Sequence, residues 1–240
     1  MANNDSKVPE SKVIVALDYA DAISALELVN QLDPTLCKLK VGKELFTAAG
    51  SHLVEKLITK NFDVFLDLKF HDIPNTVAKA CEVASNLGVW MLNVHASGGS
   101  TMMQAALEGV NKTNHKPYLI AVTVLTSMNQ ASLNEIGVET SVENQVLKLA
   151  KLSQNSGLHG VVCSALEAQL LRQHLPSNFL LVTPGIRPVS ASLDDQSRVL
   201  TPSQALHMGA NYLVIGRPIT QANKPIEALI AINQEIQALL

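Results

Sequence analysis

Asp67, Lys69 and Asp72 stand close together in the segment 63–76, which reads DVFLDLKFHDIPNT. The segment opens with β-branched and aromatic residues and then turns polar before a proline, which predicts a strand, a short loop and the start of a helix. Residues two apart on a strand share a face and lie about 6.6 Å apart. Asp67 and Lys69 should therefore point the same way, with Asp72 just beyond, so that three ionisable groups converge at the strand end.

These charges could belong to a solvated strand end or to a catalytic site. Leu66, Leu68 and Phe70 fill the alternate face, so we expect the strand to be covered on both sides. A covered strand carries charges only where they are paired and used. Because partly buried, alternating charges are also how proteins hold ionisable groups in unusual states, we interpret the three as catalytic candidates.

Apolar runs alternate with segments of helical spacing along the whole chain. Strands are expected at residues 13–17, 37–41, 63–70, 91–94, 118–125, 160–163, 179–183 and 212–215. Helices are expected at about residues 20–32, 44–59, 75–86, 100–110, 142–155, 166–174, 202–208 and 226–240.

Eight such β/α units in one domain fit a closed parallel barrel better than an open sheet, whose glycine-rich first turn is missing here. We therefore predict an α/β fold, a single-domain (β/α)8 TIM barrel over residues 12–240. Residues 1–11 are polar, which predicts a flexible N-terminal tail.

A barrel of this kind carries its active site at the carboxyl ends of the strands. Those ends hold Asp18, Lys40, Asp67, Lys69, His95, Thr126, Ser164 and Arg217. Polar residues are common there because strands end in loops. Two lysines and two carboxylates on inward faces are more than chance usually places there. The expected core of the site is therefore Asp18, Lys40, Asp67 and Lys69.

The last two strand ends have the residues of a phosphate site. Barrels often hold a phosphate with the loops after strands seven and eight. Gly216 would let a backbone N–H approach closely, and the guanidinium of Arg217 suits a phosphate. The loop from residue 186 to 200 is long enough to be a lid or binding loop, and it carries Arg187, Gln196 and Arg198. A solvated surface position is the alternative for Arg198.

The composition favours small molecules as partners. The net charge of −3 offers no general attraction to nucleic acid or to an acidic membrane, and no basic run occurs. The three cysteines at 37, 81 and 163 are widely separated in apolar surroundings, as expected for reduced core thiols rather than a disulfide or metal framework. We find neither a signal peptide nor an apolar run of membrane-spanning length, so we expect a soluble, cytoplasmic protein.

The motif Asp67-x-Lys69-x-x-Asp72 resembles the signature of the orotidine 5′-phosphate decarboxylase family. The resemblance extends over nearly the whole chain, through VALD at 15–18, KVG at 40–42, LTS at 125–127, TPGIRP at 183–188, DQSR at 195–198 and VIGRPI at 214–219. Asn211 departs from the pattern, where an aspartate is expected. Because this position precedes the last strand and lies away from the site, it does not change the assignment.

The resemblance implies a homodimeric barrel that uses no cofactor or metal and converts orotidine 5′-phosphate to uridine 5′-phosphate in pyrimidine biosynthesis. Lys69 would be the proton donor and Asp67 would face the substrate carboxylate, while Lys40 and Asp18 would hold the ribose hydroxyls. Asp72 and Thr76 would come from the other subunit.

The remaining roles that the resemblance implies concern the base and the phosphate. Thr126 and Ser127 would lie at the pyrimidine, and which of them makes the main contact stays open. The implied contacts on the phosphate side are Pro184, Arg187 in the closing loop, Gln196 bridging towards the phosphate, and Gly216 and Arg217 binding it. His71 and His95 are interpreted as structural, since neither is the proton donor that the resemblance requires.

Two other functions fit part of this pattern. A metal-dependent sugar-phosphate lyase such as hexulose phosphate synthase shares Asp-x-Lys-x-x-Asp, but it needs a carboxylate ligand at the end of strand two, where this chain has Lys40. A non-catalytic nucleotide or sugar-phosphate-binding barrel is the second alternative, because fold does not determine function. The complete set of charges speaks against it.

Overall fold

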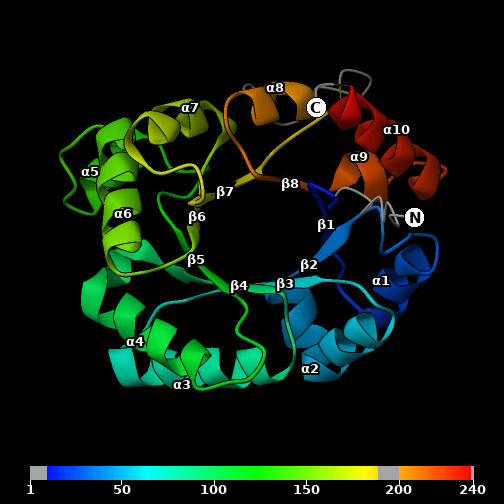
Figure 1. The fold of residues 1–240 in the computed structure, drawn as a ribbon, viewed down its shortest axis with the longest axis horizontal. Coiled ribbons are helices and arrows are strands. Elements are labelled where there is room, and N and C mark those ends of the chain that lie inside the picture. The colour runs from blue at the N-terminus through cyan, green and yellow to red at the C-terminus, as the bar shows by residue number, and fades with distance from the viewer. Residues whose placement is uncertain (1–9, 189–199, 239–240) are drawn as a thin grey trace, which may run out of the picture.

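The computed structural model describes residues 10–188 and 200–238, and its eight strands close into a parallel barrel surrounded by helices (Figure 1). The strands are β1 (Val13–Leu17), β2 (Lys38–Gly42), β3 (Val64–Phe70), β4 (Met91–His95), β5 (Tyr118–Val122), β6 (Gly160–Val162), β7 (Leu180–Pro184) and β8 (Tyr212–Ile215). Each strand pairs with the next, and β8 closes the ring on β1. The predicted (β/α)8 fold is confirmed.

The helices pack around the outside of this ring (Figure 1). They are α1 (Ala22–Val29), α2 (Lys43–Thr59), α3 (Pro74–Asn86), α4 (Gly99–Asn111), α5 (Gln130–Glu135), α6 (Val142–Asn155), α7 (Ala165–His174), α8 (Pro202–His207), α9 (Arg217–Thr220) and α10 (Pro225–Gln237), with a 3-10 turn at Ala96–Gly98. None of the helices in the described ranges is long and apolar enough to cross a membrane.

The period-two alternation of each strand divides the core into two parts. Ile14, Phe65 and Met91 belong to the cluster that fills the barrel interior. Their neighbours Val15 and Leu66 belong to the larger cluster between the strands and the helices. Strands covered on both faces read as continuous apolar runs, which explains why the sequence predicts them well.

The largest difference between the predicted and observed strands is at the end of β5, and the structure adds two short helices. β5 ends at Val122, three residues before the predicted end at residue 125. The next residue, Thr123, uses its hydroxyl as well as its N–H to bond the carbonyl of Val162, and the chain then leaves the ladder. Helices α5 and α9 were not predicted, because six and four residues are too few to show a helical period.

The N-terminal end of the barrel is closed by Lys38. Its ammonium lies 2.6 Å from Asp63, 3.0 Å from Glu10 and 4.4 Å from the centre of the Trp90 ring. The hydroxyl of Ser11 donates to the carbonyl of Leu36. Residues 10 and 11 therefore contact the barrel, while the rest of the predicted tail lies outside the described residues.

The three cysteines lie inside the packed core. All are buried, and none is disulfide-bonded in the described parts of the chain. Burial raises the pKa of each thiol to about 12, which makes the reactive thiolate scarce at neutral pH. This agrees with the interpretation of reduced core thiols.

Candidate active site

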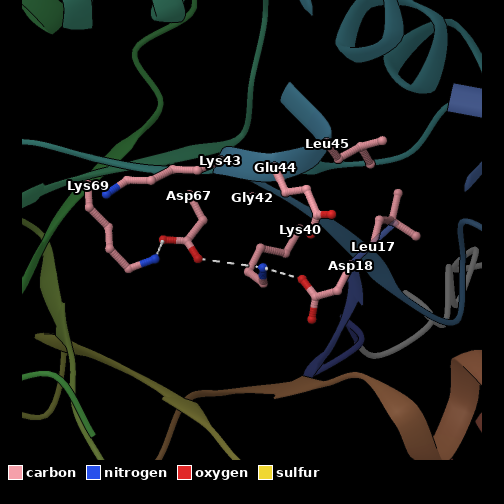
Figure 2. Close-up of a pocket in the computed structure, with 9 residues that line it drawn as sticks. All are labelled: Leu17, Asp18, Lys40, Gly42, Lys43, Glu44, Leu45, Asp67 and Lys69. Carbon is pink, nitrogen blue, oxygen red and sulfur yellow. Dashed lines mark hydrogen bonds and ion pairs between the residues drawn. The ribbon is translucent and has the colours of Figure 1, made fainter. Parts of the chain in front are cut away.

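Four side chains form a row of alternating charge at the carboxyl ends of β1, β2 and β3 (Figure 2). The Lys69 ammonium lies 2.6 Å from Oδ1 of Asp67, and the Lys40 ammonium lies 3.5 Å from Oδ2 of the same carboxylate. Lys40 also lies 3.2 Å from Oδ1 of Asp18. The four residues predicted as the core of the site are thus brought together.

The register of three parallel strands places this row. Lys40 pairs with Ala16 on β1 and with Phe65 on β3, both of which point into the barrel. Asp67 lies opposite Gly42, so it extends one pleat further towards the rim. Gly42 also leaves room for the row, because a Cβ there would stand 3.2 Å from the Lys40 ammonium.

Burial increases from the outer end of the row, at Asp18, to its middle, at Lys40 and Asp67, and Lys69 forms the inner end. The side chain of Asp18 is 69% exposed, whereas those of Lys40 and Asp67 are 12% exposed and that of Lys69 is 25% exposed. Each buried ammonium has a carboxylate neighbour, so the row leaves no uncompensated buried charge. The inner end is enclosed enough to strengthen electrostatic interactions, and the outer end is open to a polar ligand.

Lys69 occupies an irregular position on β3. The pairing of β3 with β4 shifts register between Leu66 and Phe70, and Lys69 has a φ of 53°, in the left-handed region. Its N–H donates to the side-chain carbonyl of Asn93 on β4 at 2.8 Å. The amide nitrogen of Asn93 donates to Oδ1 of Asp67 at 2.7 Å. Sequence reasoning missed Asn93, although a polar residue within the apolar strand MLNVH was a signal.

Two histidines stand beside the inner end of the row. The rings of His71 and His95 lie 5.6 Å apart between centroids. Burial lowers the pKa of His95, the neighbouring side chains of His71, Lys43 and Lys69 lower it further, and the carboxylate of Asp67 opposes them. This shift favours the neutral imidazole, which adds no positive charge to the site.

Asp72 does not join this row within the chain. It is exposed just beyond β3, and its carboxylate accepts the N–H of Ile73. No ion pair involves it among the residues that the structure describes. Thr76, in the first turn of α3, is also exposed. Of the three charges predicted to converge, the structure brings together Asp67 and Lys69.

The predicted phosphate residues lie on the neighbouring part of the rim. Gly216 links β8 to α9, and a Cβ built on it would stand 3.8 Å from Asp18. Arg217 is exposed at the start of α9, and Arg187 is buried beyond the end of β7. Gln196 and Arg198 lie outside the described residues.

The other predicted strand-end residues have different positions. Thr126 and Ser127 are exposed in the loop after β5, and Pro184 is the last residue of β7. Ser164 caps α7 instead: its hydroxyl accepts the N–H of Glu167, whose carboxylate accepts the N–H of Ser164. This capping box accounts for the serine at the end of β6, so Ser164 needs no role in the site to explain it.

A cavity of about 210 Å³ opens beside the row (Figure 2). It is lined by the four charged residues, Leu17, Gly42 and the first turn of α2. Ligand pockets usually measure about 300–1,000 Å³, so a ligand of ordinary size would extend beyond this cavity along the rim.

The carboxylates of the row are not arranged as metal ligands. No group of three or more histidines, cysteines or carboxylates is clustered to hold a metal ion within residues 10–188 and 200–238. The space between Asp18 and Asp67 is taken by the ammonium of Lys40. This geometry suits an organic ligand with hydroxyl and anionic groups better than a hard cation.

Comparisons with known proteins find similar sequences along nearly the whole chain. The model of a family described as "Orotidine 5′-phosphate decarboxylase / HUMPS family" matches residues 11–232. A Nitrosococcus oceani protein named orotidine 5′-phosphate decarboxylase is 60% identical over 227 residues, covering 95% of this chain and 98% of that protein. A protein of the same name from Chromobacterium violaceum is 57% identical over 230 residues, covering 96% of this chain and 93% of that protein.

Solved structures with a similar fold are also found. The crystal structure of orotidine 5′-phosphate decarboxylase from Lactobacillus acidophilus superimposes with a TM-score of 0.85 at 39% identity, covering 94% of this chain and 98% of that one. An uncharacterized conserved protein from Geobacillus kaustophilus has a TM-score of 0.82 at 35% identity, covering 93% of this chain and 99% of that one.

Proposed function

The chain belongs to the orotidine 5′-phosphate decarboxylase / HUMPS family, and from that premise we propose that it decarboxylates orotidine 5′-phosphate to uridine 5′-phosphate and CO₂. This reaction is a step of pyrimidine biosynthesis. The observation that carries the proposal is the alternating row from Asp18 to Lys69 at the carboxyl ends of β1 to β3.

Lys69 is assigned the central chemical role. Breaking the bond between C6 and its carboxylate leaves an electron pair in the plane of the pyrimidine, where the ring carbonyls cannot delocalise it. A cation next to C6 would stabilise that pair, and an ammonium can also give C6 the proton that completes the product. The Lys69 ammonium is held 2.6 Å from Asp67 in a largely enclosed site, which suits both tasks.

Asp67 is assigned the place beside the substrate carboxylate. Two like charges in contact repel, and this repulsion disappears when CO₂ leaves. Its Oδ1 accepts from both Lys69 and Asn93, while Oδ2 has the longer contact with Lys40. Oδ1 is thus engaged by the protein, and Oδ2 is the oxygen more available to the reacting group.

The rest of the nucleotide follows the rim. Lys40 and the exposed carboxylate of Asp18 suit the ribose hydroxyls, since one can donate and the other can accept. Gly216, next to Asp18, would admit the phosphate close to the backbone, with Arg217 supplying charge. Binding at this remote phosphate can contribute energy for orienting the groups at C6. The further substrate contacts in the proposal are Thr126, Ser127, Pro184, Arg187 and Gln196.

The proposed enzyme is a homodimer in which Asp72 and Thr76 complete the partner's site. This assignment is supported by the exposed carboxylate of Asp72, which has no ion pair within the described chain, and by the 66% exposed side chain of Ile73 beside it. A cytoplasmic location is proposed with it, because reducing conditions suit three buried thiols.

The metal-dependent alternative is disfavoured by Lys40. Its ammonium lies 3.2 and 3.5 Å from the two carboxylates that would otherwise face a cation. A Mg²⁺ ion would have to displace this ammonium to reach oxygen ligands. We therefore propose a reaction without metal or cofactor.

The test is the loss of orotidine 5′-phosphate absorbance when purified protein is added. We expect turnover that persists in the presence of a chelator. The Lys69→Ala variant should lose at least about 10²-fold in kcat, since a positioned proton donor is worth that much. It should still bind uridine 5′-phosphate. Absence of turnover by the unaltered protein would refute the proposal, and loss to chelator restored by Mg²⁺ would favour the metal-dependent lyase.

A further inference from the structure

The side chain of Asn93 lies between the two central residues of the site, Asp67 and Lys69. It is fully buried on β4, with an exposed fraction of 0%. Its Oδ1 accepts the backbone N–H of Lys69 at 2.8 Å, and its Nδ2 donates to Oδ1 of Asp67 at 2.7 Å. That carboxylate oxygen also holds the Lys69 ammonium at 2.6 Å. Both ends of Lys69 are therefore positioned relative to one amide.

The irregular pairing of β3 with β4 makes this amide necessary. Leu66 pairs with Leu92 and Phe70 pairs with Val94, so three residues of β3 stand opposite Asn93 alone. A bulge of this kind leaves backbone groups without ladder partners. The side chain of Asn93 supplies the missing acceptor for the residue in the left-handed conformation.

We propose that Asn93 is a positioning residue, which sets the carboxylate of Asp67 and the backbone of Lys69 in the relative geometry that the reaction needs. It does not touch the Lys69 ammonium and acts through its two neighbours. The inference rests on the proposed function for its effect on catalysis. Its structural part, the double hydrogen bond across the bulge, stands independently of the substrate.

An asparagine is needed because the two contacts have opposite polarity. The carboxylate requires a donor, and the backbone N–H requires an acceptor. A hydrophobic residue would leave both without partners, and an ionised aspartate would place a second carboxylate against Asp67. A protonated aspartate has the shape of asparagine, with an O–H that can donate to Asp67 and a carbonyl that can accept from Lys69. An aspartate at position 93 can therefore donate to Asp67 only when it is protonated, so the effect of pH on this variant tests the hydrogen bond to Asp67.

The first variant is Asn93→Ala, assayed for decarboxylation. We expect kcat to fall about 10²-fold, because a displacement of about 1 Å in a catalytic group costs that much. KM should change by less than about threefold, since the ribose and phosphate contacts remain. An unchanged kcat in a folded Asn93→Ala protein would overturn the proposal.

The second variant is Asn93→Asp, measured across pH. The ratio of its kcat to that of the unaltered protein should be highest at about pH 5 and should fall at least about tenfold by pH 8, as the introduced carboxyl loses its proton. A ratio independent of pH would contradict the role of the donor. This variant also keeps the test possible if Asn93→Ala does not fold, because its protonated form retains both hydrogen bonds.

Urea unfolding supplies a readout without substrate. The introduced carboxyl in Asn93→Asp has a raised pKa in the folded state, so its stability relative to the unaltered protein should fall as pH rises above about 4. The matched control is Val94→Ala, which removes packing from the next residue of β4, fully buried on the opposite face. It should lower the urea midpoint while its kcat keeps the pH dependence of the unaltered protein. Absence of decarboxylation by the unaltered protein would refute the proposed function. A difference in urea midpoint between Asn93→Asp and the unaltered protein that does not change with pH would refute the positioning role.

Discussion

Two inactive variants should restore activity to each other when their subunits exchange. The first carries Lys69→Ala, which removes the proposed proton donor. The second carries Asp72→Ala, which removes a carboxylate that is exposed and has no ion pair within the described part of its own chain. If Asp72 completes the site of the partner, each lesion acts on a different site of the dimer.

The expected recovery follows from the two-fold symmetry of the proposed dimer. Random exchange of an equal mixture makes half of the dimers mixed. In each mixed dimer one site carries both lesions and the other site carries neither, because an isologous interface uses the same residues twice. Half of the sites in half of the dimers are intact, so activity should reach about a quarter of the unaltered level. Each parent should retain less than about 1%, so the rise is at least about 25-fold.

The assay measures decarboxylation before and after exchange, with native mass spectrometry reporting the fraction of mixed dimers. A mixture of Lys69→Ala with Asp67→Ala is the matched control, because both residues lie in the same row and 2.6 Å apart. In those mixed dimers each site keeps one lesion, so activity should stay at the level of the parents. If mixed dimers of the first pair form and activity does not rise, Asp72 does not act across the interface.

Three further predictions test other parts of the structure. Arg217→Ala should lower kcat/KM for orotidine 5′-phosphate at least about 10²-fold but change it less than about threefold for orotidine, because a phosphate contact acts only through a phosphate; equal losses would make Arg217 structural. Glu10 is partly buried, which raises its pKa, but hydrogen bonds from Lys38 and a tyrosine hydroxyl outweigh this and leave the pKa lowered from 4.5. Its contribution to stability should therefore be present above about pH 4.5 and be lost as pH falls below it, so the difference in urea midpoint between the unaltered protein and Glu10→Gln should shrink from pH 7 to pH 3.5; a constant difference would contradict the contact. Asn211→Asp should raise Tm by about 2–4 °C, since the hydrogen bond that Asn211 accepts from the Arg172 guanidinium would become an ion pair, while kcat stays unchanged; a lower Tm would refute this reasoning.

Local pattern was sufficient to predict the barrel. β1 and β8 have the predicted bounds, and α6 begins and ends where helical spacing predicted it. The reason is that strands covered on both faces are mostly apolar, and the apolar residues of amphipathic helices recur with a period of 3.6 residues. The end of β5 was wrong because leaving the ladder depends on a hydrogen bond from Thr123 to another strand, which no local pattern records.

Period-two alternation also predicted that Asp67 and Lys69 share a face. The 2.6 Å ion pair between them confirms this, although the bulge and the left-handed backbone of Lys69 are absent from the pattern. The contribution of Asn93 could not be predicted, because 24 residues separate it from Lys69 and only the pairing of β3 with β4 brings them together.

Lys38 and Lys40 show which properties follow from the sequence alone and which require the tertiary structure. The alternation of β2 by itself determined that both lysines lie on one face of the strand, opposite Leu39 and Val41. The ion pairs of these lysines form only when the barrel closes. Lys38 then contacts Asp63 and Glu10 at the N-terminal end of the barrel. Lys40 contacts Asp18 and Asp67 at the opposite end. Side-chain direction is a property of one strand, so the sequence carries it. The charges that a lysine meets depend on the register of neighbouring strands, which exists only once the chain has folded.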